Sequence, residues 1–338
     1  MKSIPFKAPE AFILQPKWVN IIRRAEFQVC KMSDAGERYS DPRDKIKGVI
    51  LAAGYGTRFL PASKTVPKEL FPLIDKPVID FIVTEMIQSG IKDILIVTSR
   101  RKKVLEDYLD REMELEKILI GNENKLQKIK PPKANIHFVR QREMKGTADA
   151  LSLCESFLNG SPFVLAFPDD VVFSNTPLAK QLIEVYLDSR KNVLSFKHMP
   201  GEDISRYGVI EIAEQVGDNV YKVASVVEKP IKGSELSNCV SLGRYLFTSQ
   251  VFDALRNLSE AKRSGEFYQT DLINILAAKD QVLALDFEGQ RYDIGEPLGY
   301  LKTVVDYALQ DDRLKESFEA HLRKRLQPHG TEFEAVSQ

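Results

Sequence analysis

The sequence is poor in the residues that carry thiol and imidazole chemistry. Its 338 residues include three cysteines, Cys30, Cys154 and Cys239, which lie far apart and form no CxxC pair. This spacing excludes a zinc knuckle and a disulfide framework, so we expect a cytoplasmic protein with reduced thiols. The four histidines show no HExxH or paired-ligand spacing, which argues against histidine-based chemistry.

Net charge and long apolar runs are missing as well. Lys and Arg together number 48, as do Asp and Glu, so no net field attracts nucleic acid or an anionic membrane surface. The apolar stretch at 11–22 is interrupted by Pro16 and Lys17 and is not followed by a small-residue cleavage site. No run approaches the roughly 20 apolar residues that span a bilayer. We therefore expect neither a nucleic-acid partner nor a membrane, and any bound anion must be met by local charge.

What is present is a regular alternation of apolar runs and helix-period segments, which starts at Lys47. KGVILAAG and DILIVTS have the pattern of buried strands, whereas PVIDFIVTEMIQSG and KKVLEDYLDREMELEKIL have helical periodicity. Two more strands are predicted at 135–141 and 162–170, on either side of a helix-like GTADALSLCESFL. The alternation predicts a Rossmann-like, doubly wound α/β fold with a mixed, mostly parallel sheet.

The pattern changes after Asp170. Five strand-like runs follow with little helix between them: NVLSFKH, YGVIEIAE, YKVASVVEKP, CVSLGRYLFT and QVLALDFEG. They predict an antiparallel extension of the sheet, and a charged helix is predicted from Leu298 to about Gln327. We divide the chain into an extension of unknown role at 1–46, a catalytic domain at 47–309 and a helical tail at 310–338.

The loop GYGTRFLPASKTVPKEL at 54–70 follows the first predicted strand. A glycine-rich turn after a buried strand lets backbone N–H groups converge on a phosphate. The Walker A pattern is not present, and the dinucleotide fingerprint would require glycine where Phe59 stands. Three prolines are expected to keep the loop extended, so that Arg58, Lys64 and Lys68 are displayed. A plain surface loop is the alternative, but the full string GxGTRxxPxxxxxPKxL is highly specific.

At this string the sequence resembles the sugar-1-phosphate nucleotidylyltransferases. The resemblance runs from roughly position 46 to 309 and includes, in order, KELFPLIDKPVIDFIV, YLDREMELEKIL, FVRQREMKG, AFPDDV, RYGVIEI, VVEKP, LGRYLF and YDIGEPLGYLKTVVDYAL. YLDREMELEKIL favours the uridylyl branch over the thymidylyl branch. The resemblance implies a transferase that uses UTP and glucose-1-phosphate, with Mg²⁺ as cofactor, and produces UDP-glucose and pyrophosphate.

The resemblance also implies residue roles on the nucleotide side. Arg58 would hold the leaving β- and γ-phosphates, and Lys68 would lie at the reaction centre. The other predicted nucleotide contacts are Leu51, Ala52, Ala53, Gly54 and Gly56 along the turn, and Gln141 and Gly146 at the base. Because the attacking phosphate oxygen is already ionised, no general base is needed, and alignment and charge neutralisation carry the catalysis.

The remaining roles concern the metal and the sugar. Asp169 and Asp293 would bind Mg²⁺, which prefers carboxylate and phosphate oxygens. The predicted sugar-phosphate contacts are Gly208, Glu228, Lys229 and Gly243. Each motif has a structural alternative: Asp169 and Asp170 could cap a turn, and Glu228 and Lys229 could be a solvated ion pair.

Two departures from the family pattern leave selectivity open. Residues 146–150 read GTADA, which is similar to the adenylyl-transferring relatives, and Tyr268 in EFYQTD stands where a glutamine is usual. The same chemistry with ATP or dTTP, or with another sugar, is therefore an alternative. A non-catalytic regulator that binds nucleotide sugars is a weaker alternative, because the sequence keeps Arg58, Lys68, Asp169 and Asp293. A metal-dependent glycosyltransferase is also weaker, because it would not need the GxGTR loop. We expect a homo-oligomer.

Overall fold

The computed structural model describes residues 42–201, 203–258 and 268–326. The chain divides into two units, Met1–Asp41 and Pro42–Gln338, and all of the helices and strands named below belong to the second. The apolar stretch at 11–22, Cys30 and most of the predicted extension lie outside the described residues. The boundaries proposed for the extension, the catalytic domain and the tail stay predictions.

A nine-stranded mixed sheet forms the centre of the fold, and its first four strands are parallel. Their spatial order is β5 (Asn135–Arg140), β4 (Asp93–Thr98), β1 (Lys47–Leu51) and β6 (Phe163–Ala166). All but the first residue of β1 and of β4 are buried, as expected for strands covered on both faces. These are the strands that the apolar runs predict.

The sheet continues with strands that are mostly antiparallel. The order runs on through β11 (Cys239–Phe247), β8 (Asn192–His198), β12 (Val282–Asp286), β10 (Val220–Glu228) and β9 (Gly208–Gly217). Only β8 and β12 pair in parallel among them. The predicted mixed sheet with an antiparallel extension is confirmed.

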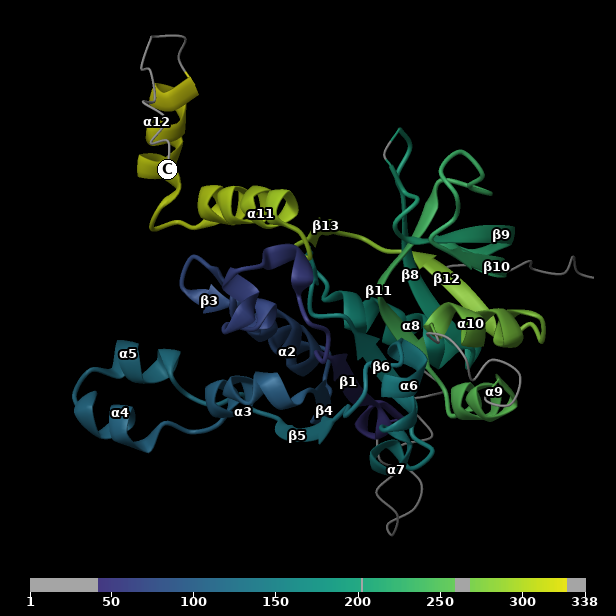
Figure 1. The fold of residues 1–338 in the computed structure, drawn as a ribbon, viewed down its shortest axis with the longest axis horizontal. Helices are drawn as coiled ribbons and strands as arrows, with labels where there is room; N and C mark the ends of the chain where they lie inside the picture. Colours follow the sequence, from purple (N-terminus) through teal and green to yellow (C-terminus); the bar gives the residue numbers. More distant parts are fainter. Residues whose placement is uncertain (1–41, 202, 259–267, 327–338) are drawn as a thin grey trace, which may run out of the picture. The chain divides into compact units, whose positions relative to one another are not determined.

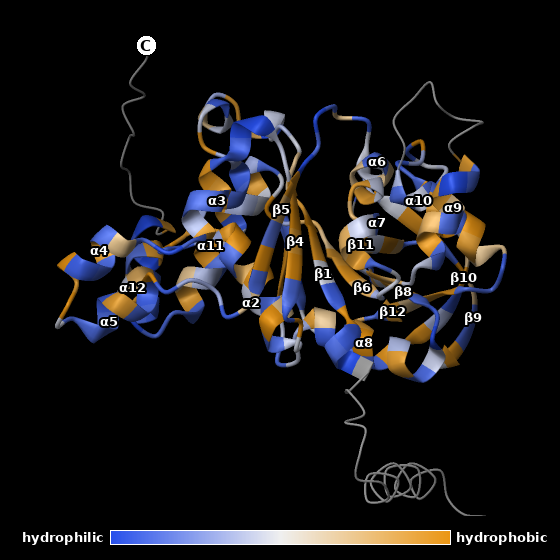
Figure 2. Cartoon of the chain, turned by 90° about the horizontal axis from the view of Figure 1, so that it is seen from below, coloured by the Kyte–Doolittle hydropathy of each residue, from blue (hydrophilic) through white to orange (hydrophobic). Residues whose placement is uncertain are grey.

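Helices cover both faces of the sheet (Figures 1 and 2). One face packs against α2 (Val78–Gln88), α3 (Val104–Leu109) and α8 (Leu178–Ser189), and the other against α6 (Thr147–Ser152), α7 (Glu155–Leu158), α9 (Gln250–Leu258) and α10 (Gln269–Ala277). Alternation along β1 explains both contacts, because Ile50 belongs to the first cluster while Val49 and Leu51 belong to the second. The fold is doubly wound, as predicted.

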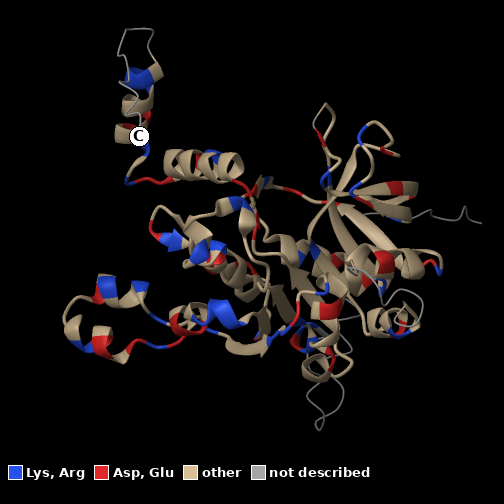
Figure 3. Ribbon diagram, viewed as in Figure 1, with Lys and Arg blue, Asp and Glu red and all other residues tan. Residues whose placement is uncertain are grey.

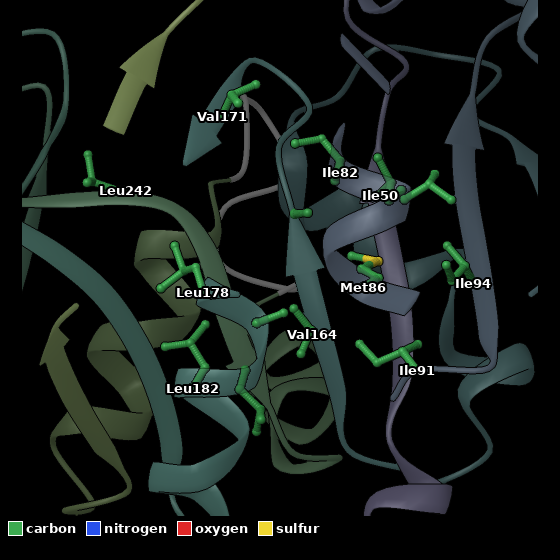
Figure 4. Close-up of a cluster of buried hydrophobic side chains, with 14 of the residues drawn as sticks. Ile50, Ile82, Met86, Ile91, Ile94, Val164, Val171, Leu178, Leu182 and Leu242 are labelled. Carbon is green, nitrogen blue, oxygen red and sulfur yellow. The ribbon is translucent and has the colours of Figure 1, made fainter. Parts of the chain in front are cut away.

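The core beneath α2 shows how closely these layers pack (Figure 4). Ile82 and Met86 lie one turn apart on α2 and cover Ile50 and Ile94 of the sheet. A side chain at Gly48 would force these residues to shift, since a Cβ there would lie 2.7 Å from the sulfur of Met86 and 3.2 Å from Cγ1 of Ile94. Burying each such side chain contributes roughly 1.5–3 kcal/mol.

Two helices predicted as continuous are each divided. The helix predicted from KKVLEDYLDREMELEKIL separates into α3 and α4 (Met113–Ile118), followed by α5 (Glu123–Lys128), because Asp110 is extended and the carboxylate of Glu112 caps Glu114 N–H. The C-terminal helix separates into α11 (Pro297–Gln310) and α12 (Lys315–Leu326) at Asp311, which is also extended. Helical periodicity continues through both breaks, so it did not reveal them.

Two small sheets complete the described fold. β2 (Pro72–Leu73) pairs with β3 (Lys76–Pro77), and β7 (Asp170–Phe173) pairs with β13 (Gln290–Asp293). The second pairing places Asp293 opposite Asp170, although the two are far apart in sequence. This contact was not predicted.

Charges of both signs are spread over the described residues, whereas the apolar side chains gather mainly in the two buried clusters. Figure 3 shows lysines and arginines interspersed with aspartates and glutamates along the elements. Within the described ranges, every helix is too short or too polar to cross a membrane.

Candidate active site

The candidate site begins where β1 ends. Ala52 and Ala53 are buried, and the N–H of Ala52 donates to the carbonyl oxygen of Val97 on β4 at 2.8 Å. Leu51 is also buried, whereas Gly54 is exposed. The predicted nucleotide turn therefore leaves the carboxyl edge of the parallel strands, where ligands of open α/β sheets bind.

The loop after this turn folds into short helical turns, so the expectation of an extended loop is wrong. It forms three short 3₁₀ turns, Thr57–Phe59, Ala62–Lys64 and Lys68–Leu70. The hydroxyl of Ser63 donates to the carbonyl oxygen of Gly56 at 2.7 Å and closes the loop on itself. Gly56 has a φ of +67°, which favours glycine. Proline restricts the backbone locally, but it did not prevent these turns.

The predicted catalytic cations differ in their surroundings. Arg58 is exposed, and within the described part of the chain its guanidinium makes no hydrogen bond or ion pair. Lys68 is turned inward and forms an ion pair with Asp169, in which the two side chains are 18% and 30% exposed. Arg58 is thus free to take an anionic ligand, whereas Lys68 is already positioned.

The Lys68–Asp169 pair keeps both groups charged. Burial disfavours the ammonium of Lys68, but the charges of Asp169 and Glu69 outweigh it, so the pKa of Lys68 lies above its ordinary value. Burial likewise disfavours the carboxylate of Asp169, yet the ion pair with Lys68 lowers the pKa of Asp169 below its ordinary value. A fixed cation and a fixed anion stand side by side at neutral pH.

A buried ion pair fixes the loop next to Lys68. Glu69 accepts two hydrogen bonds from the ammonium of Lys102, at 2.7 and 2.8 Å, and both side chains are nearly inaccessible. Lys102 lies just beyond β4, so the pair ties the loop to the central sheet. Burial lowers the pKa of Lys102. The sequence pattern did not single out this pair, since Lys102 was expected on a helix face.

The predicted metal ligands face one another across a glycine. A Cβ at Gly295 would lie 2.9 Å from Oδ2 of Asp169 and 3.0 Å from Oδ1 of Asp293. The two carboxylates therefore converge on a place that carries no side chain. The described residues contain no cluster of three or more metal-binding side chains. Two carboxylates fit Mg²⁺, which takes its remaining ligands from phosphate and water.

Arg291 contacts the carboxylates of Asp170 and Asp293, a role that the motifs did not indicate. Its Nε donates to Oδ1 of Asp170 at 2.5 Å, and its guanidinium lies 3.5 Å from Asp293 and 4.9 Å from the ring of Tyr207. The hydroxyl of Tyr207 donates to Asp293 at 2.6 Å. The i, i+2 spacing of Arg291 and Asp293 on a strand was the available signal, because such residues share a face.

The Asp170 carboxylate connects this centre to the predicted sugar side. Its Oδ2 accepts the N–H of Gly243 at 2.8 Å, and a Cβ at Gly243 would overlap it. Burial raises the pKa of Asp170 despite the nearby Arg291. Gly243 is therefore glycine because a carboxylate occupies the adjacent space.

The other predicted sugar residues meet at the start of β9. Gly208 pairs with Glu228 across the β9–β10 ladder, and a Cβ at Gly208 would lie 3.4 Å from the Glu228 carboxylate. Burial raises the pKa of Glu228, which Lys229 and the Thr270 hydroxyl counteract in part. Lys229 has a φ of +47°, uncommon for a side chain other than glycine, and its ammonium lies 4.9 Å from the Tyr268 ring. Tyr268, noted as a departure, thus borders the predicted sugar site.

The predicted base contacts lie together at the end of β5. The amide nitrogen of Gln141 donates to the carbonyl oxygen of Gly146 at 3.2 Å and to Asp149 at 2.8 Å. The hydroxyl of Thr147 donates to Gln269 at the start of α10, at 2.5 Å. The departing segment GTADA therefore contacts a predicted base residue and links it to the helix beside Glu228.

A second buried ion pair supports the turn that carries Asp169. Arg244 donates to both oxygens of Glu85, each at 3.0 Å, and to the carbonyl oxygens of Phe167 and Gly243, also at 3.0 Å. Arg244 is 1% exposed. The pair anchors the turn that carries Asp169 to helix α2.

Comparison with known proteins identifies the family. The family described as nucleotidyl transferase matches residues 47–310. A UTP–glucose-1-phosphate uridylyltransferase of Staphylococcus epidermidis is 42% identical over 282 residues, which cover 82% of this chain and 97% of that protein.

Solved structures lead to the same family. A crystal structure of UDP-glucose pyrophosphorylase complexed with UDP-glucose is 34% identical with a TM-score of 0.70, and the match covers 79% of this chain and 100% of that one. A UTP-bound UGPase from Acinetobacter baumannii is 30% identical with a TM-score of 0.74, covering 82% and 99%. The resemblance inferred from the GxGTR loop is confirmed: the chain belongs to the nucleotidyl transferase family, among relatives named UTP–glucose-1-phosphate uridylyltransferases.

Proposed function

We propose that the chain transfers a uridylyl group from UTP to glucose-1-phosphate and releases UDP-glucose and pyrophosphate. The observation that carries this proposal is the convergence of Lys68, Asp169 and Asp293 at the carboxyl edge of the parallel strands. The names of the similar proteins supply the substrates, because relatives sharing this architecture are uridylyltransferases and UDP-glucose pyrophosphorylases.

The reaction needs alignment and charge, and the site offers both. A phosphate oxygen of glucose-1-phosphate attacks the α-phosphorus of UTP, and the bond from that phosphorus to the β-phosphate bridging oxygen breaks. The electron pair leaves with pyrophosphate, and no proton has to move. Lys68 would lie against the α-phosphate, since its ammonium already stands beside a metal carboxylate. Arg58 would hold the two phosphates that leave, through its planar fork.

Mg²⁺ is the proposed cofactor, bound by Asp169 and Asp293. When bound, it would neutralise phosphate oxygens and align the two substrates. Lys68 accompanies Asp169, and Arg291 with Tyr207 orients Asp293. These residues keep both carboxylates aimed at the side-chain-free place beside Gly295.

The substrates would occupy the two ends of the site. Leu51, Ala52, Ala53, Gly54 and Gly56 would follow the nucleotide, with Gln141 and Gly146 at the base. Glu228 would accept hydrogen bonds from sugar hydroxyls between Gly208 and Gly243, while Lys229 would neutralise the sugar phosphate. The same chemistry with another nucleotide is the second candidate, because Asp149 of the GTADA segment accepts a hydrogen bond from Gln141, one of the predicted base contacts.

The test is pyrophosphate release with glucose-1-phosphate and Mg²⁺, with UTP, dTTP, ATP, GTP and CTP supplied one at a time. We expect the largest kcat/KM with UTP. A clear preference for another nucleotide would keep the chemistry and replace UTP as substrate. No release with any of the five, or with other sugar phosphates, would overturn the proposal.

Location and assembly are proposed on separate grounds. Cys154 and Cys239 are free thiols, which suits a cytoplasmic enzyme. A homo-oligomer would cover exposed apolar side chains such as Ile118, Leu298 and Leu301. Light scattering on the eluting protein measures the assembly, and a monomer at micromolar concentration would contradict it.

A further inference from the structure

We infer that Asp149 is a positioning residue that orients the amide of Gln141 and thereby selects the nucleobase. This inference rests on the proposed function, because it concerns how the same site tells one nucleotide from another. The carboxylate of Asp149, in the segment GTADA, accepts a hydrogen bond from the side-chain amide of Gln141.

Gln141 is held at three points. Its backbone N–H donates to the carbonyl oxygen of Thr98 at 2.9 Å. Its side-chain nitrogen donates to Oδ2 of Asp149 at 2.8 Å and to the carbonyl oxygen of Gly146 at 3.2 Å. The residue is 5% exposed, so the surrounding chain leaves the amide little freedom to move.

The chemistry of these partners determines which way the amide faces. An ionised carboxylate and a backbone carbonyl only accept hydrogen bonds. Turning the amide over would set Oε1 of Gln141 against two other acceptors, which costs free energy in a buried place. Both N–H bonds of the amide are therefore used by the protein, and only Oε1 is left for a ligand.

Oε1 of Gln141 is open to such a ligand. Within the described ranges this oxygen has no hydrogen-bond partner, and it is not completely enclosed by protein atoms. A base whose ring atom N3 faces this oxygen must carry a hydrogen on that atom. Uracil and thymine carry a hydrogen on ring atom N3, whereas cytosine has a lone pair there. Asp149 would thus favour UTP over CTP without distinguishing UTP from dTTP.

Among the side chains of the segment 146–150, that of Asp149 accepts a hydrogen bond from Gln141. The hydroxyl of Thr147 is occupied by Gln269, to which it donates at 2.5 Å and from whose N–H it accepts at 3.2 Å. Ala148 and Ala150 have no polar side-chain atoms. Asp149→Asn keeps the shape of the side chain but introduces an N–H donor at position 149. This donor can bond to Oε1 of Gln141, so the Gln141 amide can turn over and offer its N–H to a base.

The test compares the wild-type chain with Asp149→Asn, using UTP, dTTP and CTP. Two quantities are measured: kcat/KM for pyrophosphate release with glucose-1-phosphate and Mg²⁺, and the Kd of each nucleotide by calorimetry without the sugar phosphate. We expect the UTP-to-CTP ratio to fall about 10-fold, on the scale of one mispaired buried polar group. The UTP-to-dTTP ratio should stay unchanged.

Three further variants sharpen the result. Glu143→Gln makes the same chemical change in an exposed residue that pairs with Lys145, and should leave both ratios as in the wild type. Asp149→Ala removes the acceptor without adding a donor, and it should also lower the UTP-to-CTP ratio. It replaces Asp149→Asn in the test if thermal melting shows that Asp149→Asn is unfolded. In a Gln141→Ala background, Asp149→Asn should have no additional effect on the ratios, because its only route is lost.

The outcomes separate this inference from the proposed function. A wild-type chain that binds and uses UTP, together with unchanged ratios in both Asp149 variants, would overturn the role of Asp149 alone. Equal loss for UTP and CTP would also overturn it, since that is what a merely structural residue produces. A wild-type chain that neither binds nor uses any of these nucleotides would overturn the proposed function and this inference with it.

Discussion

Ion pairs of two kinds lie within one site, and they differ in whether their charged atoms stay accessible to a ligand. Glu85 with Arg244 and Glu69 with Lys102 are closed pairs: both carboxylate oxygens are engaged, and each side chain is at most 9% exposed. Lys68 with Asp169 is an open pair, with side chains 18% and 30% exposed. Arg58, beside it, has no partner in the described residues.

The difference separates support from chemistry. A closed pair satisfies its own charges, so it can fix a backbone turn but cannot take a ligand. An open pair keeps lone pairs and N–H groups for a phosphate or a metal. We expect changes in closed pairs to affect mainly stability, and changes in the open site to affect mainly catalysis.

The largest expected effect comes from breaking a closed pair. Arg244→Met leaves the buried Glu85 without its cation and should lower the free energy of unfolding by about 3–5 kcal/mol. Urea unfolding measures it. Replacing both, Arg244→Met with Glu85→Leu, should recover part of the loss. An unchanged urea midpoint in Arg244→Met would show that the pair does not support the fold.

Asp293→Asn tests the open side of the comparison. The amide can still accept the N–H of Gly295, which donates to Asp293 at 2.9 Å, but it is a poorer Mg²⁺ ligand. We expect kcat/KM to fall by about 10²–10³-fold, with the urea midpoint within error of the wild type. Asp312→Asn, a change at an exposed residue between α11 and α12, is the control. Full activity at low Mg²⁺ would remove Asp293 from the metal site.

Arg58→Ala removes a cation that forms no ion pair with any residue the structure describes. We expect a loss of about 10²-fold in kcat/KM and no change in stability. Arg58→Lys should recover only part, because a point charge does not match two phosphate oxygens as a planar fork does. Arg323→Ala, exposed on α12, controls for the loss of charge. Normal turnover in Arg58→Ala would contradict the role given to the GxGTR loop.

The smallest expected effect concerns Glu228, a half-buried carboxylate at the predicted sugar site. Because burial raises its pKa in the folded chain, the folded state binds this proton more tightly than the unfolded one, and stability declines as the pH rises through that pKa. Glu228→Gln should therefore unfold at a slightly higher urea concentration than the wild type at neutral pH. This difference in stability should vanish below the ordinary pKa of a glutamate side chain.

The same variant should bind glucose-1-phosphate more weakly, which separates stability from function. Urea unfolding at several pH values and KM for glucose-1-phosphate provide the two readings. Glu211→Gln, on the exposed side of β9, is the control. A less stable Glu228→Gln at neutral pH would show that the carboxylate is stabilising where it stands.

Much of the site could be predicted because its motifs are local. The turn Leu51–Gly56 follows a strand that its own apolar residues specify, and Asp169 follows another strand in the same way. The doubly wound fold came from the same alternation. Where the prediction relied on local periodicity alone, at Asp110 and Asp311, it missed a break that a single extended residue introduces.

Other parts of the site depend on partners distant in sequence. Arg291 contacts Asp170 only because β13 pairs with β7, 121 positions away in sequence. Thr147 meets Gln269 across 122 positions. No local pattern contains such pairs, since each partner reads as an ordinary polar residue until the chain has folded.

By itself, the sequence determined the strands and the family, because these depend on residue types at short, regular spacings. Tertiary structure alone decided which charges close on each other and which stay open, and that Asp149 faces Gln141. The physical reason is that burial and partner geometry set the behaviour of a charge, and both are properties of the folded chain.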